Sequence, residues 1–225
     1  MRRIVIPLIF GLTGAAILIS LGLWQVQRLE WKRGILAQIE TRIAGAPAPL
    51  PAAPDPERDR YQPVVLTGTL QPEALYVLVS QKRVGAGYRV ISPFETQAGD
   101  RILVDRGFIA VQDRDAARAS GPVQITGNLH WPDDRTSSTP ANDVAGNIWF
   151  ARDIDAMAAA LDTAPLLVIT RETSPALPGV TPLPVDAAGI PDDHLQYAVT
   201  WFSLAAIWLV MTGTYIIRVP REKEG

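Results

Sequence analysis

Two long apolar stretches stand near opposite ends of the chain. The first runs from Ile4 to Trp24 without an ionisable residue, and about 20 apolar residues are what a helix needs to cross roughly 30 Å of bilayer hydrocarbon. A cleaved signal peptide has an apolar region of only about 7 to 15 residues, followed closely by a cleavage site with small residues. No such site follows Trp24, so the stretch predicts an uncleaved transmembrane helix.

The second apolar stretch runs from Tyr197 to Ile217 and ends at Arg218. Trp201 near one boundary and Tyr215 near the other are placed where aromatic rings settle at headgroup depth. The alternative, a helix buried in the core of a soluble domain, does not account for that placement. We therefore expect a second transmembrane helix over 195–217.

Between these stretches the pattern changes to short runs of β-branched and aromatic residues separated by Gly, Pro, Asn and Asp. Such runs are typical of strands. Helices are expected around Asp113 to Ala119 and from Asp153 to Leu161, the latter with Asp153 as its N-cap. The expected fold class is a membrane protein with two transmembrane α-helices flanking an α+β, mainly antiparallel β domain, built as a small barrel or sandwich. The six predicted strands are Val64–Leu70, Leu75–Val79, Tyr88–Ser92, Arg101–Val111, Val123–His130 and Leu166–Thr170.

One pattern, V-x-[LI]-T-G-x-L, occurs twice, at 64–70 and again at 123–129. Glycines inside strands mark bulges or close approaches of another backbone. We interpret the repeat as two equivalent sheet positions, with no functional meaning.

The three- and four-residue spacing of Trp24, Arg28, Trp31, Ile35 and Ile39 predicts that the first helix continues past the membrane. Prolines then stop it, since they favour an extended linker. The expected organisation is a tail at 1–3, a first span at 4–24 continuing to about 43, a Pro-rich linker at 46–60, a β-rich domain at 61–190, a second span at 195–217 and a tail at 218–225.

Basic residues predict the orientation of the two spans. Arg2 and Arg3 precede the first span, and Arg218, Arg221 and Lys223 follow the second span. Because cytoplasmic flanks of membrane spans carry an excess of Lys and Arg, both termini are expected in the cytoplasm. The β domain would then face the periplasm of a bacterial inner membrane, or the intermembrane space if the chain is mitochondrial.

Composition and motifs exclude several classes of function. The net charge is −2, which provides no positive field for nucleic acid. The absence of cysteine rules out disulfides, thiolate metal sites and thiol redox chemistry. The chain contains no phosphate-binding loop, nucleophile elbow or zinc-protease motif, so we expect a protein that is not an enzyme. Asp105 and Arg106 are expected to be structural ion-pair members, because neighbours in a strand point to opposite faces.

His194 is the candidate ligand. It precedes the second span, and on a helix it shares a stripe with Tyr197 and Trp201. Trp24 and Arg28 lie at a similar depth on the first span, so aromatic surface, an imidazole and a guanidinium are available to a flat macrocycle with carboxylates, such as haem. The alternative is an ordinary interfacial histidine within an aromatic belt. His130, by contrast, is expected to be a loop residue without a ligand role.

Five segments together resemble the surfeit locus protein 1 family of cytochrome c oxidase assembly factors. They follow one another in that family's order and cover both spans and the domain between them. In this sequence they are LGLWQVQRLEWK (Leu21 to Lys32), GYRVISPF (Gly87 to Phe94), VDRGF (Val104 to Phe108), NIWFARDIDAMA (Asn147 to Ala158) and HLQYAVTW (His194 to Trp201). The family often has Asn at Asp105 and near Asp192, where this chain has carboxylates.

The resemblance implies an assembly factor of the respiratory chain that binds haem a transiently and helps to insert or stabilise it in the catalytic subunit of a haem-copper oxidase. Its implied partners are that subunit, the lipid bilayer and an enzyme of haem a synthesis. The implied haem contacts are His194 as axial ligand of the iron, with Tyr197, Trp201, Trp24 and Arg28 around the ring. Asp192 or Asp193 would either orient the imidazole or repel a propionate.

A second hypothesis is a scaffold that holds an oxidase assembly intermediate without binding haem. Gly11, Gly14, Ala15 and Gly22 favour close contact with a partner's membrane helix. A membrane-anchored enzyme is the third and weakest hypothesis, because the sequence contains no set of catalytic residues.

Overall fold

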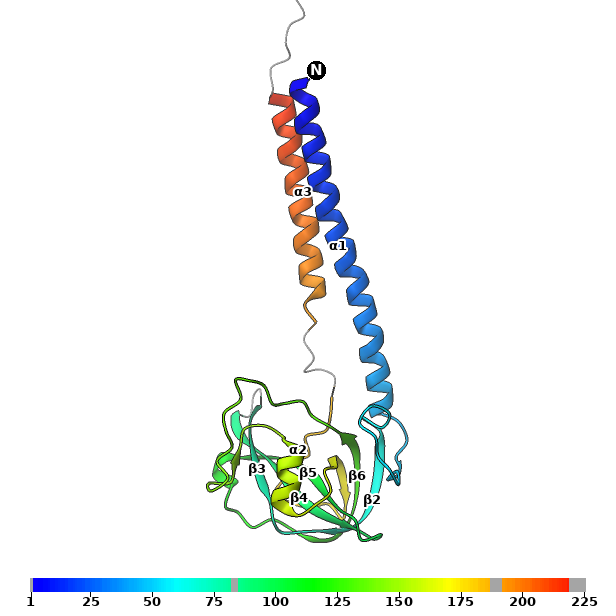
Figure 1. Cartoon of the computed structure of the whole chain (residues 1–225), viewed down its shortest axis with the longest axis vertical. Helices are drawn as coiled ribbons and strands as arrows, with labels where there is room; N and C mark the ends of the chain where they lie inside the picture. Colours follow the sequence, from blue (N-terminus) through cyan, green and yellow to red (C-terminus); the bar gives the residue numbers. More distant parts are fainter. Residues whose placement is uncertain (1, 82–84, 187–191, 219–225) are drawn as a thin grey trace, which may run out of the picture. The chain divides into compact units, whose positions relative to one another are not determined.

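The computed structural model describes residues 2–81, 85–186 and 192–218, and the side chains from Ile4 onward. The predicted tail residues Arg221 and Lys223, and the side chains of Arg2 and Arg3, therefore lie outside the described part. The chain divides into two compact units, Met1–Gln38 with Ala187–Gly225, and Ile39–Asp186. The first unit contains two helices, α1 (Arg2–Ile43), which continues into the second unit, and α3 (His194–Arg218) (Figure 1).

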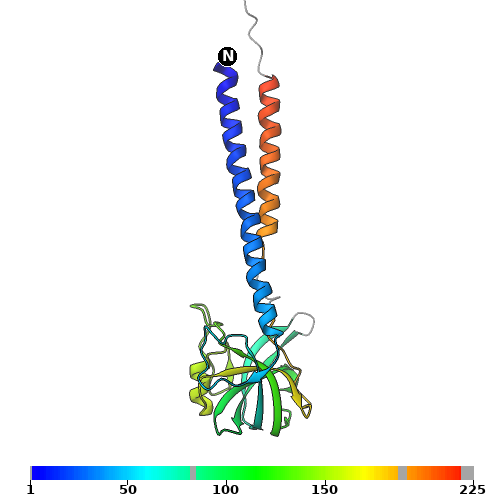
Figure 2. The ribbon, with the colours of Figure 1, turned by 90° about the vertical axis from the view of Figure 1, so that its right-hand side faces the viewer.

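Helices α1 and α3 lie side by side in both views (Figures 1 and 2). Their contact is built on glycines of α1: a Cβ added to Gly11 would lie 2.1 Å from Thr212, and one added to Gly14 would lie 2.5 Å from Trp208. The indole Nε1 of Trp208 donates a hydrogen bond of 2.9 Å to the carbonyl of Gly11. Small residues permit such close packing of helices in lipid. The chain's own α3 thus occupies the surface that the sequence suggested for a partner's helix.

The outer faces of this helix pair are apolar. In the most apolar 18-residue stretch of each helix, 11% of the stretch is buried in α1 and 6% in α3. Exposed side chains include Ile9, Phe10 and Val210. A core helix of a soluble domain would bury these side chains, so the two helices are membrane spans, as the sequence predicted.

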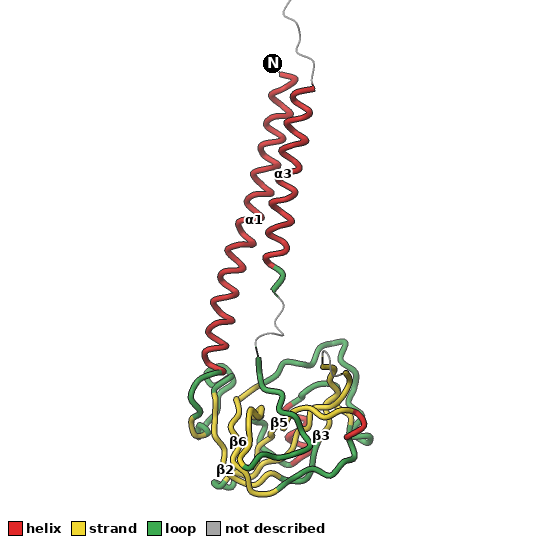
Figure 3. The backbone as a smooth tube through the Cα atoms, turned by 180° about the vertical axis from the view of Figure 1, so that it is seen from behind, coloured by secondary structure: helices red, strands yellow, loops and turns green. Residues whose placement is uncertain are grey.

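The second unit is a β domain (Figure 3). Its sheet follows the order β1-β2-β6-β8-β5-β4-β3-β7, and an additional pairing of β2 with β4 closes the five strands β2, β6, β8, β5 and β4 into a ring. The domain is therefore a barrel rather than a sandwich. Neighbouring strands of the ring are antiparallel except β5 and β8. The strands are β1 (Ala48–Pro49), β2 (Pro63–Leu70), β3 (Leu75–Gln81), β4 (Gly85–Thr96), β5 (Arg101–Ala110), β6 (Gly121–His130), β7 (Ile148–Trp149) and β8 (Leu167–Ser174).

The repeated V-x-[LI]-T-G-x-L pattern lies on two paired strands, β2 and β6. A Cβ on Gly68 would lie 2.0 Å from the carbonyl oxygen of Glu95, and one on Gly127 would lie 2.5 Å from that of Ile169. Both glycines stand where a third strand's backbone approaches closely. The structural interpretation of the repeat is confirmed.

Of the two short helices predicted within the domain, one is correct. Helix α2 (Ile154–Leu161) begins after Asp153, whose carboxylate accepts a hydrogen bond from the amide of Ala156. Met157 of α2 packs into an apolar cluster with Leu103 and Leu167. The other prediction, over 113–119, is wrong: only the 3-10 turn η1 (Val111–Asp113) forms there. That segment has no apolar stripe to bury, since residues 115–117 are all exposed.

Candidate functional site

His194 is the first residue of α3, and its side chain is paired with α1. Its Nδ1 lies 2.9 Å from Oε1 of Gln25. Gln25 is 9% exposed, whereas Gln27 on the same helix is exposed. Because an amide oxygen only accepts, Nδ1 of His194 is the donor, and the lone pair of the neutral ring is on Nε2.

The sequence left two roles open for Asp192 and Asp193, orienting the imidazole or repelling a propionate, and the structure has Gln25 at Nδ1 of His194. The backbone carbonyl of Asp193 accepts from the amide of Tyr197 in the first turn of α3. Oδ1 of Asp192 is buried without a hydrogen-bond partner among the described residues. The orienting group instead comes from α1, 169 residues away in the sequence, and sequence spacing carries no signal for such a pair.

The aromatic residues predicted around His194 are not buried. Trp24 and Tyr197 are 55% and 54% exposed, and Trp201 is half-buried. The residues of α3 that are buried are Ala198 and Ala205. Trp24 and Tyr197 are therefore accessible to a flat ligand, and equally to lipid headgroups.

Arg28 lies on the exposed side of α1 with its guanidinium carbon 3.7 Å from the ring centre of Trp31. This cation–π contact holds the side chain while leaving its hydrogen-bond donors available. Among described residues, Arg28 takes part in none of the ion pairs between side chains. A carboxylate of a bound molecule is a chemically suitable partner for it.

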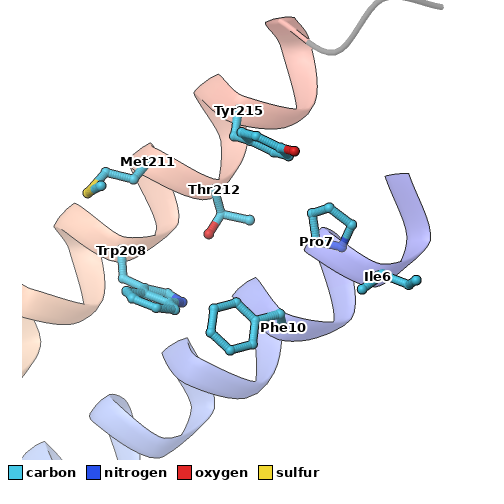
Figure 4. A pocket seen from close by; sticks show the side chains of 7 residues that line it. All are labelled: Ile6, Pro7, Phe10, Trp208, Met211, Thr212 and Tyr215. Atoms are coloured by element: carbon cyan, nitrogen blue, oxygen red, sulfur yellow. The ribbon is translucent and has the colours of Figure 1, made fainter. Parts of the chain in front are cut away.

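A groove lies elsewhere on the helix pair (Figure 4). It has a volume of about 400 Å³. Phe10 and Gln25 are separated by about 22 Å along α1 at 1.5 Å per residue, so the groove is not part of the His194 site. Its lining residues are Ile6, Pro7, Phe10, Trp208, Met211, Thr212 and Tyr215.

The β domain contains a buried ion pair between Asp105 and Arg89, 2.5 Å apart. Oδ1 of Asp105 also accepts from the amide of Gly107, and Arg89 donates to the carbonyl of Leu183. Burial raises the pKa of the Asp105 carboxyl, and the Arg89 guanidinium opposes that rise. Arg106 donates to the carbonyl of Ala119 rather than to a carboxylate. The structural interpretation holds for Asp105, but Arg106 forms no ion pair with the described residues.

His130 is the last residue of β6, as the predicted strand Val123–His130 has it, and does not lie in the following loop. Its ring lies 5.4 Å from that of Tyr61, measured between centres. Burial, with the nearby cation of Arg152, lowers the pKa of His130 to about 4. Its Nδ1 has no hydrogen-bond partner in the described part of the chain. His130 is thus partly buried, and its lowered pKa favours the neutral imidazole at physiological pH.

Across the described residues, no three His, Asp or Glu side chains gather in a way that would hold a metal ion. The iron of a porphyrin brings most of its ligands with it and needs one imidazole from the protein. His194, held by Gln25 through Nδ1, fits that need.

Comparison with known proteins identifies the family. The SURF1 family model matches residues 12–206. The chain belongs to the SURF1 family. Human Surfeit locus protein 1 is 31% identical over 210 residues, which cover 83% of this chain and 70% of the human protein. The SURF1-like protein of Rickettsia prowazekii is 31% identical, and the match covers 95% of this chain and 92% of the Rickettsia protein. The SURF1-like protein of Rickettsia bellii is 30% identical, and that match covers 88% of this chain and 86% of the relative.

The SURF1 match spans residues of α1, the β domain and most of α3. It includes both Gln25 and His194. Relatives occur in bacteria and in animals, and their names do not describe an enzyme. The family resemblance inferred from five short segments is confirmed.

Proposed function

We propose that this chain is an assembly factor for a haem-copper oxidase that binds haem a transiently through His194 and aids its insertion or stabilisation in the catalytic subunit. The observation that carries the proposal is the His194–Gln25 contact, in which the Nδ1–H tautomer of the imidazole has its lone pair on Nε2. Bound haem would supply the redox-active iron that the oxidase needs. The chain supplies a ligand and a surface, and no catalytic step.

Each of the other site residues has a proposed role. Trp24 and Tyr197 present exposed rings on which an apolar macrocycle packs, and Trp201 extends that surface. Arg28, held on Trp31, pairs with a propionate. Since these residues sit at the outer end of the first span (4–24) and at the start of α3, the proposed site lies at the membrane surface and not among the acyl chains.

We place both termini in the cytoplasm and the β domain outside it. The excess of Lys and Arg at the termini supports this orientation. The membrane is then the bacterial inner membrane, or the mitochondrial inner membrane in a eukaryote. The proposed partners are the catalytic oxidase subunit and the enzyme that makes haem a.

The proposal is tested by the absorption spectrum of the full chain, purified in detergent from cells that make haem a. The wild type should carry a haem a spectrum, and His194→Ala should lose it. His130→Ala is the matched control, because His130 lies in the β domain and should leave the spectrum unchanged. A wild-type preparation without haem, together with normal haem content of the oxidase in His194→Ala cells, would refute the proposal.

The alternative is a scaffold that binds an oxidase intermediate without haem. The groove of about 400 Å³ on the helix pair favours it, because its apolar lining is chemically suited to apolar side chains of a partner's membrane helix. Under this alternative, cross-linking recovers the oxidase subunit equally well from cells lacking haem a. Recovery that depends on haem a and on His194 would contradict it.

A further inference from the structure

Gln25 is placed unlike its neighbours on α1. It is 9% exposed, while Trp24 beside it is 55% exposed and Gln27 is also exposed. A buried amide is costly unless it is hydrogen-bonded. Its Oε1 has the Nδ1 of His194 as partner, 2.9 Å away. The contact joins the two spans at the point where the candidate ligand stands.

The chemistry of the contact determines which nitrogen of His194 is available. A carboxamide oxygen accepts and never donates, so Nδ1 must carry a proton. The opposite nitrogen, Nε2, then holds the lone pair in the neutral ring. Metal-binding histidines generally have such a partner on their other nitrogen, which fixes the tautomer and the ring orientation.

The neutrality of Gln25 has a second effect. Carboxylate partners raise the basicity of a ligating imidazole, whereas an amide fixes the ring without adding charge. Two carboxylates, Asp192 and Asp193, adjoin the ligand in sequence, but no described contact joins either of them to the imidazole. An imidazole held by an amide is a weaker metal ligand than one held by a carboxylate. A weaker ligand suits a site that must release haem.

We infer that Gln25 is a positioning residue that fixes His194 as the Nδ1–H tautomer and keeps it a moderate, releasable ligand. The inference rests on the proposed function for the identity of the ligand, haem a. The tautomer itself is a property of the chain without haem. It can therefore be measured separately.

The first experiment uses full-length chain with ¹⁵N-histidine in phospholipid nanodiscs, without haem. Only two histidines are present, so His130→Gln assigns the signals of His194. Two-bond ¹⁵N–¹H spectra should show the Nδ1–H form of His194 in the wild type, in Gln27→Leu and in Gln25→Glu. Gln25→Leu should lose that preference. A wild-type His194 in the Nε2–H form, or an unchanged Gln25→Leu spectrum, would overturn the inference.

The second experiment titrates the same four proteins with haem a and follows the Soret band. Loss of a residue that orients a metal ligand typically alters metal affinity about 10- to 100-fold, so Gln25→Leu should bind more weakly by about that factor and Gln27→Leu should match the wild type. Gln25→Glu should bind more tightly and release haem more slowly. Equal haem affinities of Gln25→Leu, the wild type and Gln25→Glu would refute the role of Gln25 even if haem binds. A wild type that binds no haem but shows the expected tautomers would refute the proposed function alone.

Discussion

The helix pair and the β barrel use polar residues in opposite ways. The barrel encloses an ion pair, Asp105 with Arg89, within a domain whose apolar side chains face inward. The helix pair turns its apolar side chains outward and packs through glycines, and its polar contact, Gln25 with His194, sits at the end of α3. Water surrounds the barrel and lipid surrounds the helix pair, so a buried polar contact has a different meaning in each region. A buried polar pair in the barrel is structural, whereas one at the end of a membrane helix is a functional candidate.

The largest expected effect comes from removing the ion pair of the barrel. Asp105→Asn should destabilise the domain by about 3–5 kcal/mol, because Arg89 would be left buried without its counter-charge. Chemical unfolding of the full chain in detergent, followed by tryptophan fluorescence, measures the loss. Asp115→Asn, at an exposed position, is the control. If the double variant Arg89→Met with Asp105→Leu is as unstable as Asp105→Asn, the stranded charge is not the cause.

The stability of the barrel should also depend on pH through His130. Its pKa is about 4 in the folded chain and about 6.5 in an unfolded one. The unfolded state therefore binds the proton more readily, and the free energy of unfolding should fall by up to about 3 kcal/mol as pH drops from about 6.5 to 4. His130→Gln should flatten this part of the pH profile, while His194→Gln should keep it. A profile that His130→Gln leaves unaltered would argue against a buried neutral imidazole.

The helix pair should be broken by side chains at its glycines. Gly11→Leu places carbon atoms where Thr212 already stands, and overpacking of this kind costs roughly 1–3 kcal/mol. Titration with SDS, monitored by circular dichroism, should show the helices separating at lower detergent. Gly213→Ala is the matched control, because nothing lies within 4 Å of its added Cβ. Equal behaviour of the two variants would mean that the glycine contact does not hold the helices together.

The smallest expected effect concerns the one short helix of the β domain. Asp153→Ala removes the cap of α2 and should cost about 1 kcal/mol. Asp153→Asn keeps a capping oxygen and should lose much less. The same fluorescence-monitored unfolding measures both. A loss in Asp153→Asn as large as in Asp153→Ala would point to the ion pair with Arg135 instead.

The sequence predicted those features that depend on local periodicity. The two spans, the six longer strands and the helix capped by Asp153 all follow from spacing within one segment. What it missed depends on distant segments. Closure of the barrel requires the pairing of β2 with β4, and the partner of Asp105 is on another strand. The short strands β1 and β7 carry two residues each, too few for any periodic signal.

The candidate site divides in the same way. His194 was identified because it adjoins a span, which sequence shows directly. Gln25 is not recognisable in the sequence as the orienting group, because only the packing of α1 against α3 brings it to Nδ1. The neighbouring Asp192 and Asp193 were more obvious in sequence, yet the backbone of Asp193 is used in the first turn of α3.

The separation of 169 residues between Gln25 and His194 has a consequence for biosynthesis. Ribosomes add about 5–20 residues per second, so the first span waits on the order of ten seconds or more before its partner is translated. During that interval Gln25 has been translated and His194 has not. A site that needs both residues therefore forms only after the entire intervening domain has been translated.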